Sequence, residues 1–169
     1  MRDETVARSY ASTLFALAER HEGLEAYGEG IDTVAALLDA QPRFRLFLET
    51  PRIEDADKKA LLGKILEHSI PKHLLSFLQI VIDKRRQRIL RDIAREYRAL
   101  VDEHYGREHV EVTVARPLDE STERRMVERL SAVLGREAIP HVRVRPEILG
   151  GFVLRTGDII YDASVQRRL

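Results

Sequence analysis

The chain has 169 residues, 44% hydrophobic and 33% charged, which is the composition of a globular protein rather than a disordered or fibrous one. Its 28 basic and 28 acidic residues cancel, and this balance argues against a nucleic-acid binder held by bulk electrostatics. Cysteine is absent, which excludes disulfides, thiolate metal sites and cysteine nucleophiles.

Charged residues interrupt every hydrophobic stretch before it approaches the roughly 20 residues that span a bilayer. The N-terminal segment carries Asp3 and Glu4 and lacks the apolar region of a secretory signal. We therefore expect a cytosolic protein of a bacterium, which associates with a membrane only through partners.

Six helices are predicted before Gly106, because apolar residues recur there at helical spacing. Pro42 begins the third helix, Pro51 ends it, and Pro71 lies where the fifth begins. The sixth is expected from Gln87 to about Tyr105. Short connections between six helices favour an antiparallel bundle over residues 1–105.

Periodicity changes to two after Gly106. The alternation HVEVTVA predicts a strand from His109 whose valines share one face. A helix follows, capped by Asp119 or Ser121 and ended by Gly135. HVRVR from His141 predicts a second strand.

The closing stretch, GGFVLRTGDIIYDASVQRRL, predicts two more strands around a turn at Gly157 and a final helix that Asp162 caps. The fold class is therefore mainly α: an N-terminal six-helix bundle, residues 1–105, followed by a small α/β domain, residues 106–169. A phosphate loop and an acidic pair, Asp158 with Asp162, are alternatives for this stretch. The glycine pair precedes a strand rather than a helix, and each aspartate has a structural role available.

Both ends of the chain resemble the delta subunit of F-type ATP synthases, the family that includes the mitochondrial oligomycin-sensitivity-conferring protein. The residues of the closing stretch that match the family signature are Gly151, Arg155, Gly157, Asp158, Asp162 and Ser164. Those of VARSYASTLFALA that match its first helix are Ala7, Arg8, Tyr10, Ala11, Phe15 and Ala18. The predicted order of elements fits the family over the whole chain.

The resemblance implies a non-catalytic stator subunit that keeps the catalytic head from turning with the rotor during proton-driven ATP synthesis. It implies that the helical domain binds the N-terminal segment of the alpha subunit, and that the second domain binds the C-terminal region of the peripheral stalk b subunit. It also implies a peripheral position at the cytoplasmic face of the bacterial cell membrane, as part of the complex. With the composition and motifs of the chain, we expect no cofactor, no metal, no direct membrane insertion and no nucleic acid.

A groove for the alpha segment is expected between the first and fifth helices. The apolar residues of the first spread over roughly half its circumference, wider than one core contact needs, and Phe77 and Ile80 point away from the apolar side of the fifth. The alternative is that both surpluses pack inside the bundle. The expected contact residues are Tyr10, Thr13, Leu14, Leu17, Phe77, Ile80, Val81 and Lys84.

Motifs for catalysis do not occur in the sequence. The six histidines form no HExxH, no serine lies in GxSxG, and no Walker or GxGxxG pattern is present. EDADKK, from Glu54, lacks the glycine and distal glutamate of a calcium loop, so its acids are better explained as favourable charges in a helix's first turn.

The alternative function is a nucleic-acid-binding helical module. Its evidence is a basic stripe over residues 84–98, formed by Lys84, Arg85, Arg86, Arg88, Arg91, Arg95 and Arg98. A solvated helix face explains the same residues, since Asp92 and Glu96 lie among the arginines and no aromatic series accompanies them.

Overall fold

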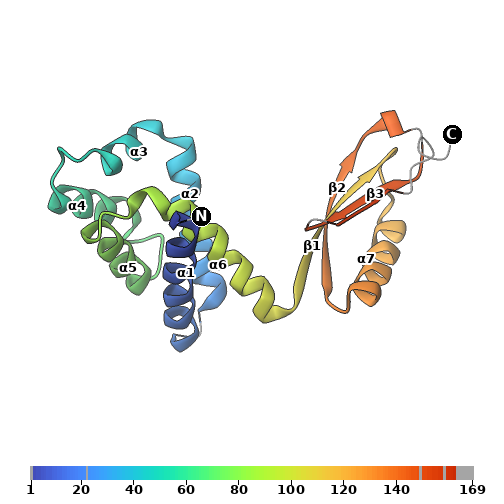
Figure 1. Ribbon diagram of the computed structural model, residues 1–169, viewed down its shortest axis with the longest axis horizontal. Coiled ribbons are helices and arrows are strands. Elements are labelled where there is room, and N and C mark those ends of the chain that lie inside the picture. Colours follow the sequence, from blue (N-terminus) through green and yellow to red (C-terminus); the bar gives the residue numbers. More distant parts are fainter. Residues whose placement is uncertain (1, 22, 149, 158, 163–169) are drawn as a thin grey trace. The chain divides into compact units, whose positions relative to one another are not determined.

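The computed structural model describes residues 2–21, 23–148, 150–157 and 159–162 (Figure 1). The chain divides into two compact units, Met1–Val101 and Asp102–Leu169. The unit boundary lies within the sixth helix, a few residues before the change of periodicity at Gly106. Within the described residues, no helix combines the length and hydrophobicity needed to cross a bilayer.

Seven α-helices lie in the described residues, six of them before Gly106. Their bounds are α1 Arg2–Arg20, α2 Leu24–Ala40, α3 Pro42–Glu49, α4 Asp55–Leu66, α5 Lys72–Asp83 and α6 Leu90–Tyr105, with α7 Glu120–Leu134 in the second unit. The expectation of a plain six-helix bundle is too simple. The six helices range from 8 to 19 residues. In Figure 1 they cross at varied angles and do not share one axis direction.

The start of the sixth helix differs from the prediction. Residues Gln87–Ile89 form a 3-10 turn, and α6 begins only at Leu90. Gln87 is buried and donates from Nε2 to the carbonyl oxygen of Leu48 at 2.9 Å. This hydrogen bond holds the turn against α3. Helical periodicity in the sequence cannot predict such a contact between distant segments.

One hydrophobic core fills the N-terminal unit and takes residues from all six helices. Tyr97 is fully buried in it and donates its hydroxyl to the carbonyl oxygen of Leu24 at 2.8 Å. Gly30 allows α2 to approach α5 closely, because a Cβ atom there would lie 2.5 Å from Cδ2 of Leu74. The unit is thus closely packed where α2 meets α5.

The second unit is a four-stranded sheet with α7 on one face (Figure 1). Its strands are β1 Arg107–Val114, β2 Glu137–Val144, β3 Phe152–Thr156 and β4 Ile159–Asp162. The order is β2-β1-β3-β4, with β1 and β2 parallel and the other pairs antiparallel. As predicted, Val110, Val112 and Val114 share one face and are buried, and they pack with residues of α7.

Both ends of α7 follow the sequence prediction. Of the two candidate caps, Asp119 is the one used: its Oδ1 accepts from the Thr122 backbone N–H at 2.9 Å. Ser121 instead donates its hydroxyl to the same oxygen. These hydrogen bonds hold the pKa of the Asp119 carboxyl well below its usual range. Gly135 ends the helix in the left-handed conformation, with φ +66°.

The predicted turn in the closing stretch is present between β3 and β4. Thr156 pairs with Ile159, and Gly157 has φ +52°, a conformation that side chains with a Cβ resist. Asp162 is the last residue of β4. Asp158, Ser164 and the expected final helix lie outside the described residues.

A candidate helix-binding groove between α1 and α5

A groove of about 740 Å³ runs along the N-terminal unit between α1 and α5. One wall comes from α1 and the other from α5, which places it where the sequence predicts a binding site. Its lining residues are Ser9, Ser12, Thr13, Ala16, Leu17 and Arg20 on α1, and His73, Ser76, Phe77 and Ile80 on α5.

Three of the hydroxyl groups along the groove already donate hydrogen bonds within the protein. Ser12 donates to the carbonyl oxygen of Arg8 at 2.9 Å, Thr13 to that of Ser9 at 3.0 Å, and Ser76 to that of Lys72 at 3.2 Å. Each bond lies within one helix, as is common for hydroxyl side chains inside helices. The walls are therefore small and weakly polar, and an apolar ligand covering them leaves none of these three donors without an acceptor.

The apolar part of the groove is formed chiefly by α5. Phe77 is 6% exposed and meets Tyr10 of α1 edge to face, with ring centroids 6.2 Å apart. Ile80 is 52% exposed, and Leu17 of α1 is half-buried. Ile80 thus offers the largest uncovered apolar area of the lining, and the other two form a packed floor.

The opposite end of the groove is polar. Arg20 and His73 line it there, and the ring of His73 stacks on that of His21 with centroids 4.2 Å apart. An apolar end at Ile80 and a cationic end at Arg20 give the groove a direction.

Four of the eight predicted contact residues line the groove, namely Thr13, Leu17, Phe77 and Ile80. Tyr10 is half-buried against Phe77, and Lys84 is exposed just beyond the end of α5. For Leu14 and Val81 the expectation of surface contact is wrong, because both are fully buried in the core. Leu14 shares the buried face of α1 with the other core residues of that helix, which are Ala7, Ala11 and Ala18. Val81 shares the buried face of α5 with Leu74, Phe77 and Leu78.

Sequence reasoning missed the small and polar lining residues. Ser9, Ser12, Ala16 and Ser76 carry no hydrophobic signal, and Arg20 and His73 look like ordinary surface residues. The signal that could have found them is the row of small side chains along one face of α1, since small residues permit close approach of another chain.

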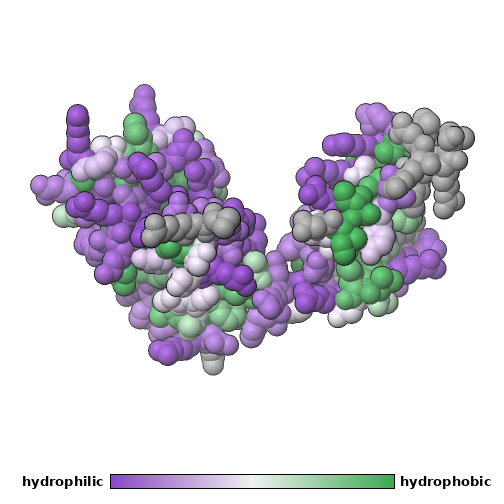
Figure 2. All heavy atoms as spheres, viewed as in Figure 1, coloured by the Kyte–Doolittle hydropathy of each residue, from purple (hydrophilic) through white to green (hydrophobic). Residues whose placement is uncertain are grey.

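The second unit has a hollow of its own, of about 720 Å³, between α7 and the ends of β1 and β3. Its apolar lining includes Met126, Leu130 and Phe152, and the signature residue Gly151 lies at its edge. Figure 2 shows hydrophobic side chains gathered on this unit. On β3 and β4 the large ones, exposed by 44–60%, are Phe152, Ile159, Ile160 and Tyr161. Of the other signature residues, Arg155 is exposed on β3 and Gly157 forms the turn.

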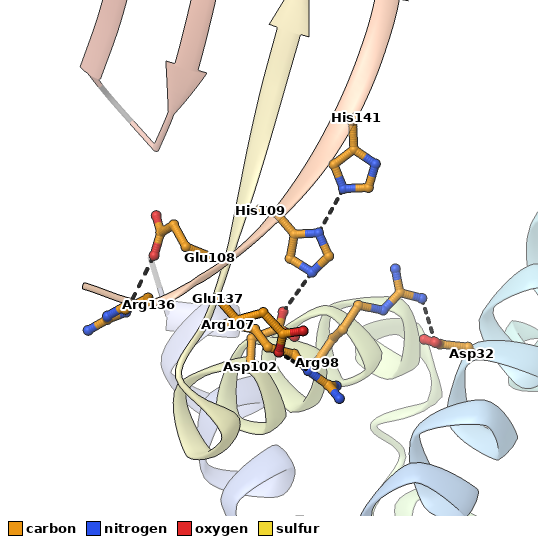
Figure 3. A network of polar contacts seen from close by, with 9 residues as sticks. All are labelled: Asp32, Arg98, Asp102, Arg107, Glu108, His109, Arg136, Glu137 and His141. Atoms are coloured by element: carbon orange, nitrogen blue, oxygen red, sulfur yellow. Dashed lines mark hydrogen bonds and ion pairs between the residues drawn. The ribbon is translucent and has the colours of Figure 1, made fainter. Parts of the chain in front are cut away.

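A polar cluster lies near the start of the sheet (Figure 3). His109 Nε2 is 3.1 Å from Asp102 Oδ2, and His109 Nδ1 is 2.7 Å from His141 Nε2. The two rings stack with centroids 5.0 Å apart. The cluster is outside both hollows, and no group of three or more His, Asp or Glu side chains within the described ranges is placed to hold a metal ion.

Arginines of the basic stripe are largely engaged in ion pairs. Arg91 lies 3.0 Å from Asp39, Arg95 lies 3.0 Å from Asp92, and Arg98 pairs with Asp32 (Figure 3). These carboxylates neutralise the stripe along α6, so the phosphate backbone of a nucleic acid meets little unbalanced charge there. A solvated helix face therefore explains the arginines of α6 better than a nucleic-acid-binding site does.

A helical unit with a surface groove, followed by an α/β unit with an exposed apolar hollow, is typical of proteins that bind other polypeptides rather than small substrates. The family model for the ATP synthase delta (OSCP) subunit matches residues 6–169. The chain belongs to the ATP synthase delta (OSCP) subunit family, whose members are structural subunits.

Relatives support this membership over the full chain. ATP synthase subunit delta of Gemmatimonas aurantiaca is 38% identical over 169 residues, which are 100% of this chain and 91% of that protein. The subunit delta of Symbiobacterium thermophilum is 34% identical with the same coverage. A chain in the cryo-EM structure of the Toxoplasma gondii mitochondrial ATP synthase hexamer shares the fold, with a TM-score of 0.69, 22% identity and coverage of 96% of this chain and 92% of that one.

Proposed function

We propose that the protein is a stator subunit of an F-type ATP synthase, joining the catalytic head to the peripheral stalk. Membership of the delta (OSCP) family supports the role. The observation that carries it is the groove between α1 and α5, where the exposed Ile80 and the small residues of α1 form a seat for a helix.

The ligand of this groove is proposed to be the N-terminal segment of an alpha subunit, bound as an amphipathic helix. The lining residues of α1 run from Ser9 to Arg20, so this helix forms a wall about 18 Å long at 1.5 Å per residue, enough for roughly three turns of a ligand helix. Apolar side chains at helical spacing would cover Ile80 and Leu17. An acidic residue near one end would face Arg20.

The second unit is proposed to bind the C-terminal region of the stalk b subunit. Its apolar hollow beside α7 and the exposed side chains on β3 and β4 supply the contact area. Placing the two contacts on separate units lets one chain hold two partners at once, so a torque on the head is opposed by both attachments.

The chain contributes no catalytic group in this role and is held at the cytoplasmic face of the bacterial membrane by the complex. What the function requires is slow dissociation under load, which comes from buried apolar contacts with well-packed surroundings. The hydroxyl groups of Ser12, Thr13 and Ser76 suit this purpose, since each keeps its acceptor within the protein when a ligand covers the groove.

Affinity capture with the full chain from the solubilised membrane fraction of the native cells tests the proposal. We expect the alpha subunit and the stalk subunit to be recovered together and to stay bound at high salt, since apolar contacts are insensitive to screening. Recovery of neither subunit, or of nucleic-acid-binding proteins alone, would contradict the stator role.

A further inference from the structure

A polar hollow of about 570 Å³ lies on the N-terminal unit where the start of α4 meets the turn after α5. It takes residues from the two charged segments that the stator role leaves unexplained, EDADKK and DKRRQRIL. Its lining residues are Glu49, Pro51, Arg52, Ile53, Glu54, Asp55, Lys58, Arg85, Gln87 and Arg88. None of them lines the groove between α1 and α5.

Lys58 brings an incompletely compensated charge to this hollow. The residue is only 2% exposed, and its Nζ lies 3.8 Å from Oδ1 of Asp55, too far for a hydrogen bond. A buried ammonium group is costly unless acceptors surround it. The lysine is therefore a donor suited to an anion in the hollow.

Gln87 brings the complementary group. The residue is 9% exposed, and its Nε2 donates to Leu48 at 2.9 Å. Its Oε1 is buried and has no hydrogen-bond partner among the described residues. Since buried acceptors are nearly always paired, this oxygen indicates a ligand that carries a donor.

Arg52, Arg85 and Arg88 are the other cations on the lining, and Arg85 is held there at a conformational cost. It has φ +55° and is the one non-glycine residue with positive φ in the described chain. Glycine commonly takes this position after a helix, and another residue there costs on the order of 1 kcal/mol. Such strain is often retained where the side chain has a function, and the arginine lines the hollow.

Carboxylates line the hollow as well as cations, namely those of Glu49, Glu54 and Asp55. A ligand must therefore accept hydrogen bonds on one side and donate on the other. A fully deprotonated anion such as sulfate only accepts, so it would leave Oε1 of Gln87 without a donor. A singly protonated oxyanion meets both demands, since it keeps one O–H group.

We propose that this hollow binds inorganic phosphate as the hydrogen phosphate ion. Its unprotonated oxygens accept from Lys58 and Arg85, and its O–H donates to Oε1 of Gln87. The side-chain carbonyl oxygen of Gln87 then selects for phosphate over sulfate, because it accepts from an O–H group that sulfate lacks. The proposal stands on residues remote in sequence from α1 and does not depend on the stator role.

The test is a calorimetric titration of the full chain with sodium phosphate and with sodium sulfate, at pH 7 and equal ionic strength. We expect saturable binding of phosphate and at least about tenfold weaker binding of sulfate, the factor expected when a hydrogen bond to a charged group is lost. Equal binding of the two anions, or no saturation with phosphate, overturns the proposal.

Variants make the assignment specific. Arg85→Gly removes the guanidinium and suits the backbone at φ +55°, so it should fold and bind phosphate at least about tenfold more weakly. Arg86→Ala removes the same charge from the neighbouring residue, which does not line the hollow, and should leave the affinity within about twofold. Gln87→Leu should reduce the preference for phosphate over sulfate. Equal effects of the two arginine changes would mean a diffuse charge effect and overturn the site.

Discussion

The ring of Tyr10 on α1 packs edge to face against that of Phe77 on α5, with centroids 6.2 Å apart and planes inclined at 72°. Edge-to-face pairs are favourable by about 0.5–1.5 kcal/mol beyond their buried area. The contact joins the two walls of the groove through their side chains. A ligand helix therefore meets a preformed seat, which reduces the entropy lost on binding.

Ile80→Asp should weaken binding of an alpha N-terminal peptide to the full chain by about 2 kcal/mol or more, because it places an unpaired charge in a dry contact. The free protein should lose much less stability, since Ile80 is 52% exposed before binding. Titration calorimetry with the peptide and a thermal melt of each protein measure the two effects.

Leu46→Asp is the matched control for this change. Leu46 is 67% exposed on α3 and does not line the groove, so the same change from apolar to acidic should leave peptide affinity unchanged. Undiminished peptide binding by Ile80→Asp would reject the groove, and collapse of the free fold would place Ile80 in the core.

Leu14→Ala separates core residues from lining residues. Leu14 is fully buried, so the truncation should lower the free energy of unfolding by about 2–5 kcal/mol, the usual cost of a cavity. Peptide affinity, measured at a temperature where the variant is fully folded, should change by much less than in Ile80→Asp. If peptide affinity fell while chemical denaturation showed unchanged stability, Leu14 would belong to the binding surface and not to the core.

Helical periodicity located α1 and α5 and the space between them, since Pro71 and the apolar series of α5 are local signals. It could not decide which apolar residues face outward. Ile80 and Val81 are adjacent and both strongly hydrophobic, yet Val81 is fully buried and Ile80 is 52% exposed. The difference is set by where α1 and the other helices cover α5, which is tertiary information.

The start of α6 shows the same limit. Its apolar pattern continues back to Gln87, so periodicity extends the helix too far. The backbone of Arg85 at φ +55° and the bond from Gln87 to Leu48 impose the 3-10 turn. In the second unit, by contrast, Asp119 and Gly135 end the helix through local chemistry, and local chemistry is readable from the sequence.

Gly157→Val should destabilise the hairpin of β3 and β4 by about 1–2 kcal/mol, because a β-branched side chain resists the conformation at φ +52°. Apart from its chain neighbours, no atom of the described residues lies within 4 Å of a Cβ placed at this position, so the cost comes from the backbone. Binding of the stalk subunit should weaken, while binding of the alpha peptide to the other unit persists. Unchanged denaturant stability and unchanged stalk capture would show that the turn tolerates a β-branched residue.

Asp119→Asn should change how the stability of the protein depends on pH. Hydrogen bonds from Ser121 and Thr122 lower the pKa of the Asp119 carboxyl in the folded state below its ordinary value of 3.8. The ionised cap therefore stabilises the folded state fully above that value, and this contribution is lost as the pH falls from about 3.8 through the lower folded value. Asparagine keeps a carbonyl oxygen for the Thr122 N–H but does not titrate.

Thermal melts of both proteins between pH 7 and pH 2 should show a wild-type advantage in stability that is constant down to about pH 5 and then shrinks in acid. An advantage that stays constant over the whole range would mean that the carboxyl titrates alike in the folded and unfolded chains, and would remove Asp119 as a charged cap.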